Sequence, residues 1–233
     1  MIEISRKPVT AGDRERPDSP TFTITVRYLR AQANGETVCV GVELTDHLRN
    51  LSETRRYTVH TSLLSELSLH RGLISQDQLD ELERIAQLSA AWQRALSILA
   101  YGSNSAQALL LKLRQRGFDE QTARAAIDLI RKQGYLKEDQ DAAREARRCV
   151  SKGWGKKRIE QYLRQRGYPA PAAQEAVQAL DDVDFDELCC RVARKYTHTP
   201  PSDAKSRQKV VAYLLRYGYD MTAIRHTLDK AWK

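Results

Sequence analysis

The hydrophobic pattern changes period once along the chain. Near the N-terminus apolar and polar side chains alternate, which is the period of a half-buried β-strand. The alternation predicts strands at 22–28, 37–42 and 56–60, with Asn34-Gly35 as a hairpin turn between the first two. Beyond these strands, apolar residues recur three and four positions apart, which predicts helices.

The first two predicted helices span 62–69 and 75–88. In the second, Ser75 followed by Gln78 forms a capping box, the usual start of a helix. The polar residues before the first strand include three prolines and mixed charges, so we expect a flexible leader there.

A short sequence recurs through the rest of the chain. LRQRGF at 113–118 returns as LRQRGY at 163–168 and, in degraded form, as LLRYGY at 214–219. The glycines lie 50 and then 51 residues apart. A glycine followed by an aromatic residue at the end of a helical pattern indicates a Schellman ending, in which the aromatic packs on the residue four before the glycine.

Alignment on these glycines places apolar residues in shared columns, such as Leu109, Ile159 and Val210. Copied three-helix units explain such columns, since each helix buries one face. The predicted helices of the three units lie at 90–100, 106–116, 121–133, 139–150, 156–166, 172–180, 185–196, 205–217 and 221–232. We therefore predict a mainly α fold. Its segments are a flexible leader (1–20), a small β-sheet and helix module (21–88), and three-helix repeats 1 (89–137), 2 (138–185) and 3 (186–233).

Charge is unevenly distributed between these parts. Residues 1–87 hold 11 Lys+Arg against 13 Asp+Glu, whereas residues 88–233 hold 27 against 17. A basic repeat region indicates an acidic partner, either nucleic acid or an acidic protein surface, although a merely solvated basic surface is the alternative. The excess is densest within 144–166, where nine cations face Glu145 and Glu160. The candidate contact residues are Arg144, Arg147, Arg148, Lys152, Lys156, Lys157, Arg158, Arg164 and Arg166.

Trp154 lies between two glycines inside this basic stretch. A tight glycine turn can present the ring to a partner, where it would stack, or can bury the ring beneath the turn. The sequence leaves both arrangements open.

Motifs for catalysis, metals or cofactors are missing from the sequence. Gly155-Lys156-Lys157 lacks the glycine and the hydroxyl residue that a phosphate-binding loop requires. The five histidines are scattered, and the four cysteines form no CxxC pair, so we expect buried, inert thiols. No apolar run is long enough to span a membrane, which favours the cytoplasm.

The repeat region resembles the RecX family, the modulators of the RecA recombinase, from about Arg94 to Trp232. Lys152-Gly153-Trp154-Gly155 followed by Arg158-Ile159 is similar to the family's most specific segment. Gly134-Tyr135-Leu136 and Tyr217-Gly218-Tyr219 also match in the right order.

The resemblance implies tandem three-helix units in an elongated, curved shape. It also implies a non-enzymatic regulator, acting in DNA repair, recombination and the SOS response, that binds the groove of the RecA–single-stranded-DNA filament. There it would inhibit ATP hydrolysis and strand exchange as a cytoplasmic monomer, without a cofactor or a membrane. A helical module that binds DNA directly is the alternative function, and an enzyme with an unrecognised site is a more distant one.

Overall fold

The computed structural model forms two compact units. The first unit comprises residues 1–100 and 112–132, and the second comprises 101–111 and 133–233. The structure describes residues 3–8, 22–33, 35–65, 67 and 69–232. The chain is mainly helical, with a small antiparallel sheet in the first unit, as the sequence predicts.

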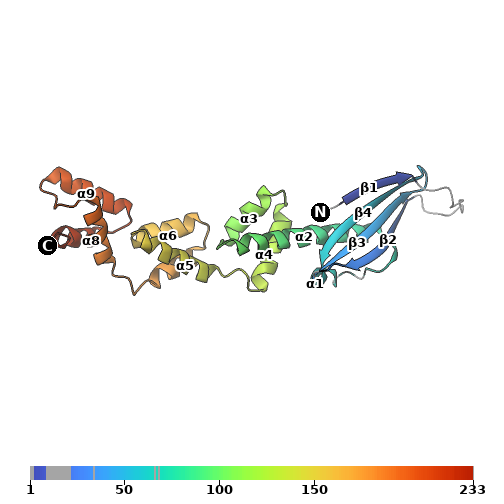
Figure 1. Cartoon of the computed structure of the whole chain (residues 1–233), viewed down its shortest axis with the longest axis horizontal. Helices are drawn as coiled ribbons and strands as arrows, with labels where there is room; N and C mark the ends of the chain where they lie inside the picture. The colour runs from blue at the N-terminus through green and yellow to red at the C-terminus, as the bar shows by residue number, and fades with distance from the viewer. Residues whose placement is uncertain (1–2, 9–21, 34, 66, 68, 233) are drawn as a thin grey trace. The chain divides into compact units, whose positions relative to one another are not determined.

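The sheet has the strand order β1-β4-β3-β2-β5, with every neighbouring pair antiparallel (Figure 1). The three predicted strands are confirmed. The hairpin between β2 and β3 closes where it was predicted, although Asn34 itself lies outside the described residues. The strands are β1 (Glu3–Pro8), β2 (Phe22–Ala31), β3 (Thr37–Asp46), β4 (Leu51–His60) and β5 (Gly72–Ile74).

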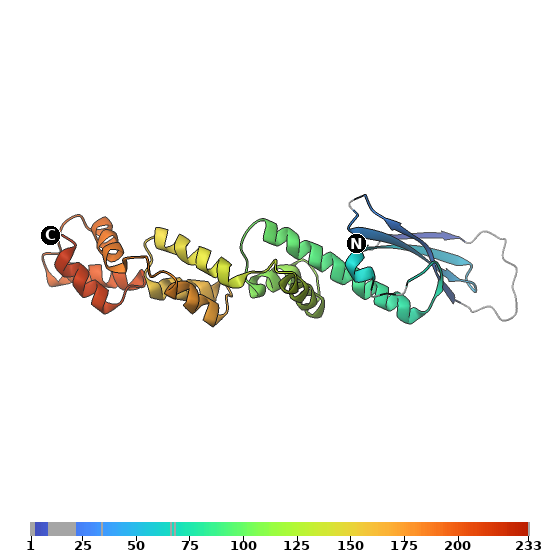
Figure 2. The same cartoon turned by 90° about the horizontal axis from the view of Figure 1, so that it is seen from below.

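One face of the sheet is covered by helix α2 (Gln76–Ala100), as Figure 2 shows. The helix begins with the predicted capping box, in which Gln78 N–H donates to Ser75 Oγ at 3.2 Å and Ser75 N–H donates to Gln78 Oε1 at 3.0 Å. Leu79 and Leu82 of α2 pack with the inward-facing valines of β3 in a single core. The alternation of apolar residues along the strands therefore serves to bury this face against α2.

The flexible leader predicted at 1–20 is wrong for Glu3–Pro8, which pairs with β4 as an edge strand. Without this partner, the backbone groups along the outer edge of β4 would have no ladder to join. The rest of the predicted leader, residues 1–2 and 9–20, lies outside the described residues.

The helix predicted at 62–69 is also wrong beyond its first turn, since α1 covers only Thr61–Leu64. Leu64, Leu67 and Leu69 all pack against the sheet core, which an irregular segment allows and one helix face does not. The chain then forms β5 on the open edge of β2.

The boundary predicted between residues 88 and 89 falls inside α2, which runs unbroken across it. Ser89 is fully buried, and its Oγ accepts a hydrogen bond of 2.8 Å from the backbone N–H of His60. The sheet module and the first three-helix repeat therefore share one helix, because no glycine or proline interrupts the pattern there.

The remaining helices occur where they were predicted, with small shifts at their ends. Helix α3 begins in the second unit and ends in the first. In the second unit, helices α5 to α7 enclose one core and helices α8 to α10 enclose another. The bounds are α3 (Ala106–Gln115), α4 (Glu120–Lys132), α5 (Glu138–Ser151), α6 (Lys156–Gln165), α7 (Ala170–Gln178), α8 (Phe185–Tyr196), α9 (Ala204–Arg216) and α10 (Met221–Lys230).

The repeated helix endings are Schellman motifs, as predicted. After α6, Tyr168 N–H donates to Leu163 C=O at 3.1 Å and Gly167 N–H donates to Arg164 C=O at 2.9 Å. The same pair of bonds closes α3 at Phe118 and α9 at Tyr219. Leu113, Leu163 and Leu214 are fully buried, as their shared column requires.

Candidate partner-binding surface

The turn between α5 and α6 is the centre of the basic stretch. Trp154 N–H donates to Cys149 C=O at 3.2 Å and Gly153 N–H donates to Val150 C=O at 2.8 Å, so α5 also has a Schellman ending. Gly153 has a φ of +79°, and a Cβ on it would lie 2.8 Å from Val192 of α8. The chain can reverse here, against the next repeat, only because this residue is glycine.

The turn is joined to the end of α9 by backbone contacts. Gly155 N–H donates to Tyr217 C=O at 2.8 Å, and Tyr219 Oη donates to Gly153 C=O at 2.9 Å. A Cβ on Gly218 would lie 2.4 Å from the backbone nitrogen of Arg158. The glycine that ends α9 therefore packs directly on the start of α6, which fixes repeat 3 against repeat 2.

The same arrangement occurs one repeat earlier. Ser105 caps α3, accepting at Oγ from Ala108 N–H at 3.1 Å. Its hydroxyl also donates to Arg166 C=O at 2.7 Å, and a Cβ on Gly167 would lie 2.8 Å from Ser105 Oγ. Gly167 and Gly218 thus each end their own helix and contact the start of the second helix of the preceding repeat. The regular spacing of the glycines in the sequence did not by itself indicate that they contact the preceding repeat.

Trp154 lies partly buried within the turn, next to two of the predicted cations. The Arg158 guanidinium lies 4.2 Å from the centroid of the Trp154 ring and 5.1 Å from that of Tyr217, and it donates to Arg216 C=O at 3.2 Å. The Lys152 ammonium lies 5.1 Å from the Trp154 centroid. Cation–π contacts of this kind hold the side chains in place. The ring therefore packs with the turn and orders its charges.

The nine predicted cations do not form one uniform patch. Four of them lie beside carboxylates, although each guanidinium remains more than half exposed. Asp182, from the loop after α7, was not predicted to approach this surface, and its pKa is lowered by the hydrogen bond from Arg147. The ion pairs are Arg144–Asp141 at 3.2 Å, Arg147–Asp182 at 2.9 Å, Arg148–Glu145 at 2.7 Å and Arg164–Glu160 at 3.5 Å.

The remaining predicted cations at the start and end of α6 differ from those four. Lys156, Lys157 and Arg166 are exposed, and among the described residues no carboxylate forms an ion pair with them. The Lys156 ammonium lies 5.1 Å from the centroid of Phe185. These three side chains, together with the exposed Lys152, are the part of the predicted basic face that is open to an acidic partner.

A groove of about 450 Å³ lies beside the α5–α6 turn, and it is lined by the end of α5, the turn itself, and helices α8 and α9 with the residue after α9. Lys152, Arg191 and Lys195 line it together with Tyr213 and Tyr217. Of these residues, only Lys152 was a predicted contact. Arg191 with Lys195 and Tyr213 with Tyr217 are each four residues apart, so each pair was visible as one helix face, but nothing in the sequence placed the two faces together.

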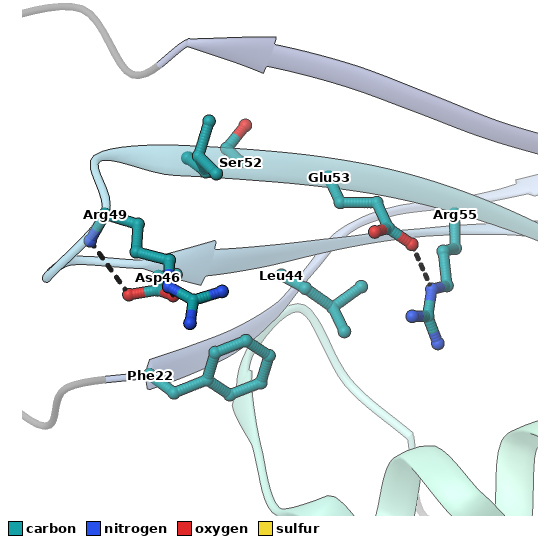
Figure 3. A pocket seen from close by; sticks show the side chains of 8 residues that line it. Phe22, Leu44, Asp46, Arg49, Ser52, Glu53 and Arg55 are labelled. Atoms are coloured by element: carbon teal, nitrogen blue, oxygen red, sulfur yellow. Dashed lines mark hydrogen bonds and ion pairs between the residues drawn. The ribbon is translucent and has the colours of Figure 1, made fainter.

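A second hollow, of about 290 Å³, lies at the end of the sheet (Figure 3). Phe22 and Leu44 line it, and its charged groups pair within it, Arg49 with Asp46 at 3.8 Å and Arg55 with Glu53 at 2.6 Å. Because its arginines are already paired with carboxylates, this hollow has less unpaired positive charge for an anionic partner than the basic surface has.

The described residues provide no cluster of three or more side chains that could hold a metal ion. The thiols of Cys149, Cys189 and Cys190 are buried and form no disulfide, and burial raises the pKa of Cys189 to about 11. A thiol with so high a pKa is protonated at neutral pH and is a poor nucleophile. No described helix combines the length and the apolar character that a membrane span requires.

Two family models match this chain. The model described as the first three-helix domain of RecX matches residues 91–128, and the model of the third three-helix domain matches residues 182–228. The matches overlap the first and last of the repeats predicted from the glycine spacing, at 89–137 and 186–233.

Comparisons with individual proteins agree with these matches. The Regulatory protein RecX of Chromohalobacter salexigens is 27% identical over 139 residues, which cover 60% of this chain and 91% of the relative. That of Xanthomonas campestris pv. campestris is 28% identical over 133 residues, covering 57% of this chain and 82% of the relative.

The fold is shared with solved structures. A crystal structure of regulatory protein RecX superposes with a TM-score of 0.72 at 20% identity and covers 89% of this chain and all of its own, so the match extends into the sheet unit. RecX from Lactobacillus salivarius gives a TM-score of 0.56 at 21% identity, over 62% of this chain and 96% of its own. The two domain matches and the relatives together show that this chain is similar to the RecX regulatory proteins in its first and third three-helix domains, and that it shares their fold.

Proposed function

We propose that this chain is a non-enzymatic regulator that binds in the groove of a RecA–single-stranded-DNA filament and inhibits ATP hydrolysis and strand exchange. The proposal places it in DNA repair and recombination, including the SOS response, as a cytoplasmic monomer. The relatives described as regulatory protein RecX support a regulatory role, and the basic surface supports binding to an acidic partner.

The observation that carries the proposal is the glycine contact between successive repeats. Gly218 packs on the start of α6 and fixes repeat 3 against repeat 2, and Gly167 contacts the start of α3 in the same unit. Contacts made by each repeat with successive protomers of a polymer would then add, since binding of one repeat raises the effective concentration of the next. A filament is such a partner, because it presents the same surface on each successive protomer.

Charge supports an acidic target for this array. Lys156, Lys157 and Arg166 project from α6 without ion pairs among the described residues. Exposed cations of this kind steer and strengthen binding to an acidic protein surface or to DNA phosphates. The four paired arginines can contribute as well, because exposed ion pairs are worth only about 0–1 kcal/mol and exchange partners readily.

The test is inhibition of RecA ATP hydrolysis on single-stranded DNA. The variant Lys156→Glu/Lys157→Glu/Arg166→Glu should raise the concentration for half-inhibition by at least about tenfold, since three charges at the contact change sign. Arg158 is left intact because it packs into the turn.

A matched control makes the same charge change in the sheet unit, as Arg30→Glu/Arg49→Glu/Arg71→Glu, with far-UV circular dichroism confirming both folds. The control should inhibit within about threefold of the parent. Equal inhibition by parent and α6 variant would remove this surface from the proposal.

The alternative function, direct binding to DNA with regulation secondary, predicts tight binding to bare single- or double-stranded DNA at physiological salt. Titration of the protein against both, without recombinase, measures this binding. Variants that keep their DNA affinity but lose inhibition of RecA would favour the filament proposal over the alternative.

A further inference from the structure

The groove beside the α5–α6 turn combines cations with tyrosine rings, unlike the proposed surface on α6. Its charged lining consists of Lys152, Arg191 and Lys195, and none of the residues that line it is acidic. Among the described residues, no carboxylate forms an ion pair with any of these three cations. The groove is therefore a concentration of uncompensated positive charge at neutral pH.

The groove also borders a row of aromatic rings. Tyr196 stacks on Tyr213 with ring centroids 4.1 Å apart and planes at 18°, and Tyr213 meets Tyr217 at 4.6 Å and 35°. Tyr196 is 42% exposed, so the end of the row is open to solvent. Burial and the hydrogen bond with Tyr217 raise the pKa of Tyr213 to about 12, so its ring stays uncharged at neutral pH.

The walls of the groove are rigidly placed. Gly153 forms part of the lining, close against Val192, and the Tyr217 carbonyl is held by Gly155 N–H at 2.8 Å. The three cations come from two repeats, Lys152 from the turn and the other two from α8. The groove therefore depends on the docking of repeat 3 on repeat 2, and a single repeat could not form it.

We propose that this groove binds a short segment of single-stranded nucleic acid, with phosphates against Lys152, Arg191 and Lys195 and a base against the tyrosine row. Cationic grooves that carry stacked aromatic rings bind single strands without strong sequence preference, because each base offers a π-face and each nucleotide a phosphate. An acidic peptide would use the cations but would supply no base to stack on the exposed Tyr196.

This site goes beyond the proposed function, since it assigns a contact to the nucleic acid itself, and it can fail while inhibition of the recombinase stands. The probe is a fluorescent thymidine strand of roughly 15 nucleotides, within the range that such grooves cover. Binding to the full chain is measured by anisotropy without recombinase, over a series of salt concentrations.

Arg191→Glu/Lys195→Glu should weaken binding at least about tenfold and reduce the slope of log affinity against log salt by about 1.4, or about 0.7 for each lost phosphate contact. Lys205→Glu/Lys209→Glu on α9 is the matched control. It makes the same charge change at exposed positions outside the groove and should stay within about threefold of the parent. Equal loss in the two variants would overturn the proposal, because only overall charge would then matter.

Two further ligands test the base contact. An abasic strand of equal length keeps the phosphates and should bind several-fold more weakly, because it offers no base to stack on the tyrosine row. Tyr196→Ser should lower the affinity for the thymidine strand towards that of the abasic strand. A polyglutamate peptide should compete poorly. Equal binding of abasic and thymidine strands, or efficient competition by polyglutamate, would overturn the assignment to nucleic acid in favour of an anion or acidic-peptide site.

Discussion

Gly218 meets two separate requirements at one residue. Its φ is +88°, which an L side chain adopts at a cost of about 1–2 kcal/mol, and a Cβ on it would also collide with the backbone of Arg158. Gly117 ends α3 with a similar φ of +91°, yet nothing lies within 4 Å of the position that a Cβ would take there. Equivalent glycines in the repeat thus experience different surroundings.

This difference predicts unequal effects of one substitution. Gly117→Ala should lower the free energy of unfolding by about 1–2 kcal/mol, the cost of the backbone conformation alone. Gly218→Ala should cost at least about 1 kcal/mol more, because repeat 3 must move away from α6. Denaturant unfolding measures both, and hydrogen exchange in α6 and α9 should rise only for Gly218→Ala. Equal losses would show that the glycine contact does not hold the repeats together.

At the scale of elements, the start of a helix can also serve as a docking point. Ser75 caps α2 through one hydrogen bond from Gln78 N–H. Ser105 caps α3 in the same way and also donates to Arg166 C=O in the next repeat. Ser75 was predicted as a cap from local sequence, whereas the second contact of Ser105 depends on a residue 61 positions away.

The two serines therefore form a natural comparison. Ser75→Ala should lower the free energy of unfolding by about 1 kcal/mol, the usual value of an N-cap. Ser105→Ala should lower it by about 2 kcal/mol, because the carbonyl of Arg166 loses a donor as well. Chemical denaturation of the full chain gives both values, and a smaller loss for Ser105→Ala than for Ser75→Ala would argue against the docking role.

At the scale of the whole molecule, charge separates the sequence into an acidic front and a basic remainder. The net charge of +8 arises entirely after residue 87, where Lys+Arg exceed Asp+Glu by 27 to 17. The structure divides these cations into two groups. Some arginines pair with carboxylates, whereas the cations at the ends of α6 and in the groove form no ion pair with a carboxylate among the described residues. Unpaired cations are the ones that gain most from an acidic partner.

Regulation by this surface should depend steeply on salt. Raising ionic strength from about 50 to about 200 mM should increase the concentration for half-inhibition of RecA ATP hydrolysis by roughly tenfold or more, as expected when about three phosphate or carboxylate contacts are screened. Hydrolysis by RecA alone at each salt concentration is the reference. A concentration for half-inhibition that does not change over this range of salt would indicate that apolar contacts dominate binding.

The domain boundaries could not all be predicted from the local sequence pattern. We propose that the second and third repeats, at 138–185 and 186–233, act as the units that contact a filament, and their cores agree with their sequence columns. The expected division at residue 88 does not divide the fold, because Ser89 continues α2 and is buried beside β4. A helix of 25 residues contains no local signal of the place where one packing partner ends and the next begins.

The sequence by itself determined the period of the strands, the helix endings and the repeat of about 50 residues, because alternation, glycine and the aromatic after it act through neighbours in the chain. Tertiary structure decided which charges stay unpaired and which faces meet. Asp182 reaches Arg147, Gly218 reaches Arg158, and Lys152 shares a groove with Arg191. Such pairings depend on how three helices pack against the next three, and no short-range pattern records that geometry.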